Sequence, residues 1–503
     1  MANELSPTRR KRHGSNGPSN WWSELRKLRS RTGASHGRFV LLVLVIGALF
    51  RIYAMKGAVT EDEATGYVNY VSQGFAEIFT SPPTAGHHLL YAFFARISCL
   101  IFGVHEWSLR LPALIAGIFL LPLLYLFTRL VFNRHIAVIA LCLAAVSGPM
   151  VELSALAYGY TLGWCCMLAA LLAARHFVKH ESPQAAFWMA AFSALAVWSS
   201  PSMVYAAGMT YLWTLMLLAA AYKTTLRRRT VGWAISAATT LFLLVLFYLP
   251  VIMRHGLDPL LHPPSSEDRS WAGFVNVQQD RAFDLWIYFT ATAPTMLAAI
   301  SAISVGYAAY TSTKYRFLLF SLILCTVPFV LIQRTVAPPQ DWAFVLPVLH
   351  IGNAIGIFLL LKLVRDKLWP TLSEPKRTLI TGTAVLAVFG TTCALGRPEA
   401  MGRYPEARNA AEWIAVNARP GDRVAVADPW QTPVAFQLAC LKVPPVVLGP
   451  GKPEADGNCF VLVSASNGQT PTSVLEDAEL QRTATGFEPM LQWQRLELFR
   501  CSR

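Results

Sequence analysis

Long apolar segments alternate with short polar ones between residues 39 and 396. A helix that crosses a bilayer needs about 20 mostly apolar residues, because each residue adds about 1.5 Å along the helix axis. We therefore predict membrane-spanning helices throughout this region. The candidate spans are residues 39–59, 107–131, 135–153, 157–178, 184–200, 203–222, 231–252, 285–310, 316–334, 341–363 and 378–396.

One further apolar segment, His87 to Phe102, is short and is interrupted by Arg96. If it crossed the membrane, basic residues of the later loops would lie on the side opposite the basic N-terminus. If it lies in the interface, all of them fall in the cytoplasm, in agreement with the positive-inside rule. We therefore predict an α-helical polytopic membrane protein with about eleven spans and two interfacial helices, 62–76 and 87–103, at the outer surface. The loop residues that decide this are Arg129, Arg134, Arg175, Lys179, Arg227, Arg228, Arg229, Lys314, Arg316, Lys362, Arg365, Lys367, Lys376 and Arg377.

Both ends of the chain differ from the multispan region, 39–397, whose outer first loop is predicted over 60–106. Residues 1–38 are polar, contain the basic run 9–12 and lack a small-residue cleavage site. They predict a disordered basic tail, held in the cytoplasm beside anionic lipid. Residues 398–503 are polar and rich in turns. A helix over 406–418 and strands over 423–427, 459–463 and 496–501 predict a small α/β domain, which eleven spans would place outside the cell.

Composition agrees with a membrane protein, since 54% of the 503 residues are hydrophobic and 14% are charged. A soluble chain of this length could not bury so much apolar surface. The net charge of +14 reflects cytoplasmic loops in this setting, so no nucleic-acid partner is expected. The nine cysteines show no metal-ligand spacing, so we expect neither zinc nor haem. In an oxidising compartment Cys440, Cys459 and Cys501 allow one disulfide, and the sequence does not select the pair.

Three consecutive acids, Glu61, Asp62 and Glu63, follow the first predicted span. At the membrane interface a carboxylate can stay ionised and still reach the head group of a lipid. The alternative is a solvated helix start, because the helix macrodipole favours acids in the first turn. The predicted topology places other polar groups on the same outer face, namely His87, His88, Tyr158, Tyr160, the loop 254–284 and the turn 334–341.

The order of these motifs resembles a known family. The motifs are the outer pair Asp62-Glu63, the turn at His87-His88, Phe102-Gly103, Arg110 and the run Arg129-Leu130-Val131-Phe132. The chain is similar to the integral-membrane glycosyltransferases of the C superfamily, which include protein O-mannosyltransferases, aminoarabinose transferases and bacterial enzymes that modify lipopolysaccharide. The resemblance covers roughly residues 40–180 and is topological beyond them.

The resemblance implies a sugar donor linked to a polyprenyl phosphate and an inverting hexosyl or pentosyl transfer on the outer face. It implies that Asp62 is the base for the acceptor hydroxyl and that Glu63 positions Asp62 or the acceptor. His88 matches the His of the family's Asn-His turn, and His87 stands where Asn is usual; helix capping is the alternative for both. Arg51 matches a family Arg near the outer end of the first span, where snorkelling is the alternative.

The chain departs from the family pattern in two places. Tyr158 stands where members often carry Arg, before Tyr160, and Gln340-Asp341-Trp342 stands where a basic–aromatic pair is common. The lipid phosphate must then be bound by other cations, and the bidentate fork of Arg suits this role. The candidates on the outer face are Arg254, Arg269, Arg281 and Arg334. The loop 254–284 is either a lid over the donor or an amphipathic loop at the head-group level.

The leading prediction is a glycosyltransferase of a bacterial inner membrane that moves a sugar to a glycan, lipid or protein acceptor. The alternatives are a lipid or sugar transporter and a non-catalytic scaffold that presents the C-terminal domain. Transporters place ionisable groups at mid-membrane, whereas the acids of this chain cluster at one face. The acids at 61–63 could hold a divalent cation, but the resemblance implies no need for a metal, and none is expected.

Overall fold

The computed structural model describes residues 33–81, 88–222, 224–257, 270–290, 295–334, 338–368, 373–395, 402–419, 421–443, 448, 458–464, 467–477 and 486–502. The described residues form two compact units. The bundle unit is drawn from Met1–Ala54, His88–Tyr91 and Ala113–Pro398, and the loop–sheet unit from Met55–His87, Ala92–Pro112 and Glu399–Arg503.

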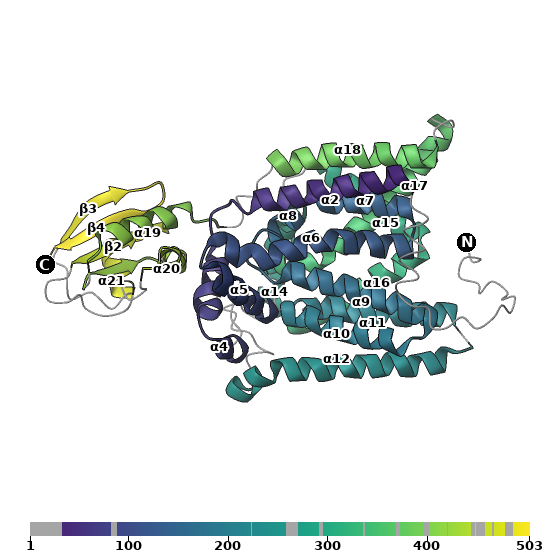
Figure 1. The fold of residues 1–503 in the computed structure, drawn as a ribbon, viewed down its shortest axis with the longest axis horizontal. Coiled ribbons are helices and arrows are strands. Elements are labelled where there is room, and N and C mark those ends of the chain that lie inside the picture. The colour runs from purple at the N-terminus through teal and green to yellow at the C-terminus, as the bar shows by residue number, and fades with distance from the viewer. Residues whose placement is uncertain are drawn as a thin grey trace. The chain divides into compact units, whose positions relative to one another are not determined.

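The bundle unit is helical, and its long helices lie side by side (Figure 1). Its helices are α2 (Ala34–Ala54), most of α6 (Glu106–Val131), α7 (Arg134–Ala145), α8 (Gly148–Leu153), α9 (Tyr160–His180), α10 (Pro183–Ser199), α11 (Met203–Ala221), α12 (Leu226–His255), α14 (Trp271–Thr290), α15 (Thr295–Thr311), α16 (Thr313–Gln333), the 3-10 helix η3 (Pro339–Val345), α17 (Leu346–Leu368) and α18 (Glu374–Leu395). Within the described ranges, seven helices are long and apolar enough to cross a membrane: α2, α6, α9, α11, α12, α16 and the continuous segment Pro339–Leu363.

The outward faces of these helices are apolar. In α12, for example, Leu241, Phe242 and Val245 are each more than half exposed. Soluble monomers rarely expose large continuous apolar surfaces, whereas a lipid environment favours them. These faces and the seven long apolar helices confirm the prediction of a multi-pass membrane protein.

Two predicted segments differ from the structure. The predicted span 135–153 is two helices, because the chain leaves α7 after Ala145 and α8 begins with Pro149 in its first turn. Proline has no backbone N–H and cannot continue a preceding helix, but it is well suited to a helix start. The prediction of a loop over the whole of 254–284 is also wrong. Helix α14 begins at Trp271, so the apolar residues assigned to one span, 285–310, are divided between α14 and α15.

The loop–sheet unit combines the first loop with the C-terminal residues. Its helices and strands are α3 (Glu61–Gly66), the π-helical turn η2 (Tyr67–Val71), α4 (Phe75–Thr80), most of α5 (Leu89–Phe102), the start of α6, α19 (Pro405–Asn417), β1 (Arg423–Val426), α20 (Gln431–Cys440), β2 (Cys459–Val463), α21 (Pro471–Asp477), β3 (Gly486–Gln492) and β4 (Glu497–Ser502). The interfacial helix predicted over 62–76 is therefore interrupted after Val71, whereas α5 agrees with the helix predicted over 87–103.

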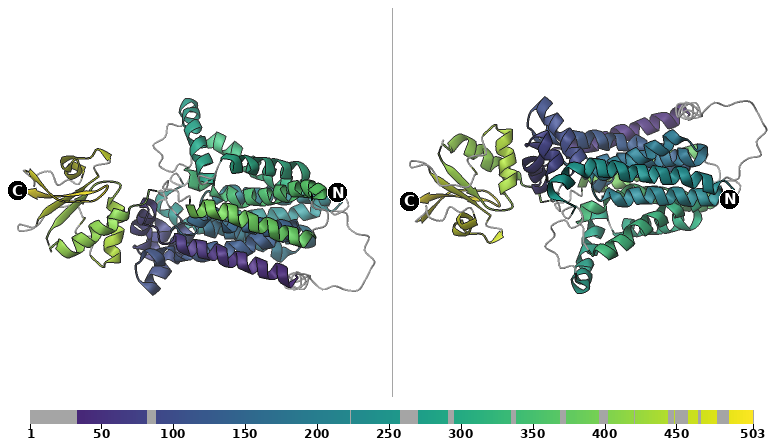
Figure 2. Two further views of the ribbon diagram at one scale, coloured as in Figure 1. Left: turned by 90° about the horizontal axis from the view of Figure 1, so that it is seen from above. Right: turned by 90° about the horizontal axis from the view of Figure 1, so that it is seen from below.

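The four strands form one sheet in the order β1-β2-β4-β3, in which β1 and β2 are parallel and the other neighbours are antiparallel. Helices lie on both faces of the sheet (Figure 2). One core contains residues of α19 and α20, and the other contains residues of α21. The predicted helix 406–418 and the three predicted strands are present. The sequence prediction missed β3, an edge strand whose residues are mostly exposed and include Pro489.

The C-terminal residues pack directly on the first loop within this unit. Arg403 forms an antiparallel bridge with Thr60, and the Tyr404 backbone N–H donates to the Val59 carbonyl at 3.0 Å. Helix α20 contacts α3 and η2 through a hydrogen bond between Thr65 and Thr432, at 3.2 Å, and through edge packing of Phe436 on Tyr67. Segments that are distant in sequence thus pack against the acidic turn and the residues next to it.

Candidate functional site

The acidic residues form the first turn of α3. Thr60 is the N-cap: its hydroxyl accepts from the Glu63 N–H, and its own N–H donates to Glu63 Oε2 at 3.0 Å. This reciprocal capping box satisfies two N–H groups at the helix start. The π-helical turn η2 follows directly, an arrangement that is frequent at functional sites. Asp62 is partly exposed, whereas Glu63 is buried.

Glu63 forms a buried ion pair with Arg110, which lies in the first turns of α6. Arg110 Nε donates to Glu63 Oε1 at 2.7 Å and Nη2 donates to Oε2 at 2.6 Å, and both side chains are at most 1% exposed. Arg110 also donates to the carbonyls of Met55, Gly57 and Ala58. The Arg110 guanidinium therefore holds in place both the Glu63 carboxylate and the backbone that leads into α3. This geometry favours a positioning role for Glu63 over direct proton transfer.

Glu61 faces the C-terminal residues. The Tyr404 hydroxyl donates to Glu61 Oε2 at 3.4 Å. Burial and the neighbouring charge of Asp62 raise the pKa of Glu61, whereas this hydrogen bond lowers it. Burial and the Glu61 carboxylate raise the pKa of Tyr404 to about 12. The three acids therefore differ: Glu63 is buried in an ion pair, Glu61 meets Tyr404, and Asp62 lies between them in the turn.

A second polar cluster lies in the bundle unit. The Tyr160 hydroxyl donates to Asp341 Oδ1 at 2.5 Å, which joins the start of α9 to η3. The His88 ring packs edge-on against Tyr160 and Tyr158, with centroids 4.9 and 6.1 Å apart. His88 Nδ1 meets the Ser199 carbonyl at 3.1 Å, and because a carbonyl only accepts, Nδ1 carries the hydrogen. Thus three of the predicted site residues, His88, Tyr158 and Tyr160, lie together.

Gly159 is required for the close approach in this cluster. A Cβ atom at this position would lie 2.0 Å from the Ser199 carbonyl oxygen and 3.0 Å from His88 Cβ. We expect Gly159→Ala to lower the free energy of unfolding by about 1–3 kcal/mol, as overpacking typically does. Thermal unfolding in detergent would measure the change. Gly306→Ala in α15 is the control, because its Cβ would enter open space; equal stability of Gly159→Ala and wild type would contradict the prediction.

His88 makes the stability of the fold sensitive to acid. Burial lowers its pKa from 6.5 to about 4. Between these values the unfolded chain binds the proton and the folded chain does not, so stability falls as the pH falls from 6.5 toward 4. The expected loss is about 3 kcal/mol over this range. Thermal unfolding at several pH values should show a smaller acid dependence in His88→Phe than in wild type. Equal slopes for both proteins would be evidence against this prediction.

Arg51, a predicted donor or acceptor contact, is fully buried near the end of α2. Its guanidinium donates to Ser154 Oγ at 3.2 Å and to the carbonyls of Gly47, Ala144 and Ala145 at 3.0–3.2 Å. These contacts tie α2 to the end of α7 and to the residue after α8. The geometry fits a side chain that organises helices at this point rather than one that snorkels to the head groups.

The four predicted phosphate-binding cations do not have the same surroundings. Arg334, after α16, places its guanidinium 4.7 Å from the ring centroid of Trp271 at the start of α14. Arg281 is half-buried within α14, and Arg254 is exposed in the last turn of α12. His87 and Arg269 lie outside the described residues.

Two residues with buried polar atoms near this cluster were not predicted as site residues. Glu152 in α8 is 5% exposed, and the Tyr288 hydroxyl of α14 is buried without a hydrogen-bond partner among the described residues. Both Glu152 and Asp341 lie within electrostatic reach of Tyr288. An acidic residue close to the end of a span is a functional candidate in a membrane protein. On that ground the sequence alone could have identified Glu152 and Asp341 as site residues, but not Tyr288.

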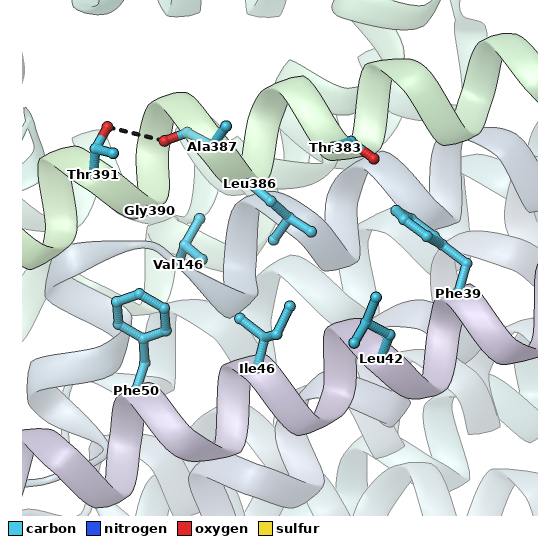
Figure 3. Close-up of a pocket in the computed structure, with 10 residues that line it drawn as sticks. All are labelled: Phe39, Leu42, Ile46, Phe50, Val146, Thr383, Leu386, Ala387, Gly390 and Thr391. Atoms are coloured by element: carbon cyan, nitrogen blue, oxygen red, sulfur yellow. Dashed lines mark hydrogen bonds between the residues drawn. The ribbon is translucent and has the colours of Figure 1, made fainter.

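The described ranges contain no group of three or more His, Cys, Asp or Glu side chains that could hold a metal ion. An apolar groove lies between α2 and α18, where Phe39, Ile46, Phe50 and Leu386 are among the lining side chains (Figure 3). The hydroxyl of Thr391 donates to the Ala387 carbonyl of its own helix. None of the described residues that line this groove is charged, so its chemistry suits alkyl chains and not a phosphate or a sugar.

Comparisons with known proteins agree with this architecture. Residues 86–252 match the family model of dolichyl-phosphate-mannose-protein mannosyltransferases. No curated protein matches the chain in sequence. ArnT from Cupriavidus metallidurans in the apo state has a similar fold, with a TM-score of 0.61, 14% identity, and coverage of 93% of this chain and 98% of that chain.

Two further solved structures share the fold. ArnT from Cupriavidus metallidurans bound to undecaprenyl phosphate has a TM-score of 0.60 at 16% identity and covers 92% of this chain and 97% of its own. The Archaeoglobus fulgidus oligosaccharyltransferase tethered to an acceptor peptide has a TM-score of 0.51 at 14% identity, with coverage of 94% and 74%. These matches confirm, at the level of the fold, the resemblance to C-superfamily membrane glycosyltransferases.

Proposed function

We propose that the protein is a membrane glycosyltransferase that moves one sugar from a polyprenyl-phosphate donor to an exported acceptor. The observation that carries this proposal is the acidic turn of α3. It presents Asp62 on a backbone held by Arg110 and Glu63, in a chain whose fold is that of ArnT. One structure of that relative is bound to undecaprenyl phosphate, which supports a lipid-linked donor.

In the proposed reaction, Asp62 is the general base. Its carboxylate takes the proton from the acceptor hydroxyl as the acceptor oxygen attacks the anomeric carbon. The bond from that carbon to the lipid phosphate breaks, and the phosphate leaves with the bonding electron pair. A single displacement of this kind inverts the anomeric configuration. In this scheme Glu63 does not contact the substrate; it holds Asp62 in position.

We further propose roles for the bundle-unit residues. The Arg334 guanidinium, which lies over the Trp271 ring, and the half-buried Arg281 are our candidates for the lipid phosphate, because Arg binds phosphate oxygens in a bidentate manner. Arg254 is a weaker candidate, since it is exposed at a helix end. The hydroxyl of Tyr160 and the carboxylate of Asp341 suit hydrogen bonds to the hydroxyl groups of a sugar. Tyr158 contributes an aromatic face in place of the Arg of many relatives.

The topology belongs to the same proposal. We infer about eleven spans, a cytoplasmic N-terminus and an outward-facing first loop and C-terminal domain, in a bacterial inner membrane. The positive-inside distribution of Lys and Arg supports this orientation. The transfer requires no metal in this scheme, because the leaving group is a single lipid-linked phosphate and arginine side chains neutralise its negative charge.

A transfer assay with purified protein tests the proposal. The protein would be incubated with a crude extract of radiolabelled polyprenyl-phosphate sugars and a panel of glycan, lipid and protein acceptors. We expect label to move to an acceptor from the lipid-linked donor and not from the matching nucleotide sugar. Use of the nucleotide sugar would overturn the donor assignment, and the absence of transfer to every acceptor would overturn the enzymatic one. Heat-denatured protein provides the control.

A further inference from the structure

Two cysteines lie opposite each other on neighbouring strands of the C-terminal sheet. Strands β2 and β4 are antiparallel, with Phe460 opposite Arg500 and Val461 opposite Phe499. One position further along the same register places Cys459 opposite Cys501. Both cysteines are thiols in this structure, and both are buried, at 5% and 7% exposure, in the core that α21 covers.

The geometry of this pair suits a disulfide. Directly opposed residues of antiparallel strands have Cα atoms about 4.5–5.5 Å apart, and disulfides join Cα atoms about 4.4–6.8 Å apart. Opposed side chains also point to the same face of a sheet. The Cys501 thiol is in hydrogen-bond contact with that of Cys459, so the two sulfur atoms already meet. Only a small closing movement is needed.

The third cysteine of the C-terminal region has different neighbours. Cys440 lies at the end of α20, the helix that packs on the first loop, where Glu106 and Cys99 act on it electrostatically. It is not part of the core that contains the other two cysteines. The structure therefore distinguishes among three thiols that the sequence leaves equivalent.

We propose that Cys459 and Cys501 form a structural disulfide in the exported protein, a modification site that ties the last strand of the chain to β2. The proposal rests on the outward orientation in the proposed function, because disulfides persist in oxidising compartments. The oxidant is the disulfide of a thiol–disulfide oxidoreductase. One cysteine thiolate attacks it to give a mixed disulfide, and the second displaces the oxidoreductase as a dithiol. The chain loses two hydrogens, and the oxidoreductase gains them.

The packed sheet disfavours this exchange once the domain has folded. The contact with Cys459 and burial raise the pKa of the Cys501 thiol, and the thiolate is the attacking species. The disulfide is thus expected to form while the strands are still accessible. It should then resist a thiol reductant in the folded protein and become reducible in denaturant.

Peptide mapping tests the proposal. Cells expressing the full chain would be opened in N-ethylmaleimide, and the protein denatured, digested and analysed by mass spectrometry without reduction. We expect a linked peptide pair containing Cys459 and Cys501, and maleimide on Cys440. The linkage should persist in Cys440→Ser and be absent from Cys501→Ser. Maleimide on both Cys459 and Cys501, or linkage of Cys440 to either of them, would overturn the pairing.

A reporter enzyme fused to the C-terminus, active only outside the cytoplasm, separates the possible causes of failure. Maleimide on Cys459 and Cys501 together with an active reporter would refute the disulfide but leave the outward orientation intact. Labelled thiols with an inactive reporter would refute the orientation, and the disulfide with it. The transfer assay is scored independently, so a protein can lack the disulfide and still be a glycosyltransferase.

Discussion

Replacement of Asp62 by Asn is expected to lower the rate of sugar transfer by about 100- to 10,000-fold, the usual contribution of a positioned general base. Asparagine has nearly the same shape as aspartate but cannot accept the acceptor's proton. Because Asp62 is partly exposed and the turn is held by Glu63 and Arg110, the fold should be retained. The measurement is transfer of labelled sugar from a polyprenyl-phosphate donor at saturating acceptor.

The matched control is Glu61→Gln, which removes a carboxylate one residue away. Glu61 faces Tyr404, so this variant should keep most of the activity. Two results would contradict the assignment of Asp62: full activity of Asp62→Asn, or an equal loss in both variants. The second result would indicate that the turn needs negative charge rather than one base. Thermal unfolding of each variant would show whether a loss of activity reflects unfolding.

Removal of either partner of the Glu63–Arg110 pair should lower the free energy of unfolding by about 3–5 kcal/mol, because a buried charge is left without its partner. Arg110→Met also removes the donors to three backbone carbonyls and should have the larger effect. The double variant Glu63→Gln/Arg110→Met should be less destabilised than the sum of the single variants. Thermal unfolding in detergent, analysed as a double-mutant cycle, measures the coupling.

The pair Arg408–Glu412 provides the control for this cycle. It lies in the same unit, and its side chains are 67% and 50% exposed. Exposed pairs four residues apart on a helix contribute about 0.3–0.5 kcal/mol, so Arg408→Met should have little effect. An Arg110→Met variant as stable as Arg408→Met would show that the buried pair does not support the acidic turn.

Much of the fold could be predicted because its signals are local. The strands beginning at Arg423 and Cys459 are short apolar runs between turn residues, and both are present. The edge strand over 486–492 has no such run, because its side chains are exposed and its stability comes from pairing with β4. The division of 135–153 between Ala145 and Gly148 has a local signal in Pro149, but the apolar residues on both sides favour one continuous span.

The candidate site was less predictable, because it depends on partners far apart in sequence. The acidic run was visible, but its three carboxylates differ through Arg110 and Tyr404, which lie 47 and 343 residues from the acids they contact. Similarly, the hydrogen bond from Tyr160 to Asp341 spans 181 residues. Residue type and spacing can identify side chains capable of chemistry. They do not identify which of these side chains already form hydrogen bonds or ion pairs with other residues of the protein.

The bridge between Thr60 and Arg403 has a consequence for biosynthesis. Membrane spans enter the bilayer as the ribosome makes them, and synthesis proceeds at about 5–20 residues per second. The 343 residues between Glu61 and Tyr404 therefore separate the two halves of this contact by about 20–70 seconds. During that interval the first loop has been synthesised but lacks its contacts with the C-terminal segment. The newly made protein is thus expected to gain its activity last, when the C-terminal segment arrives.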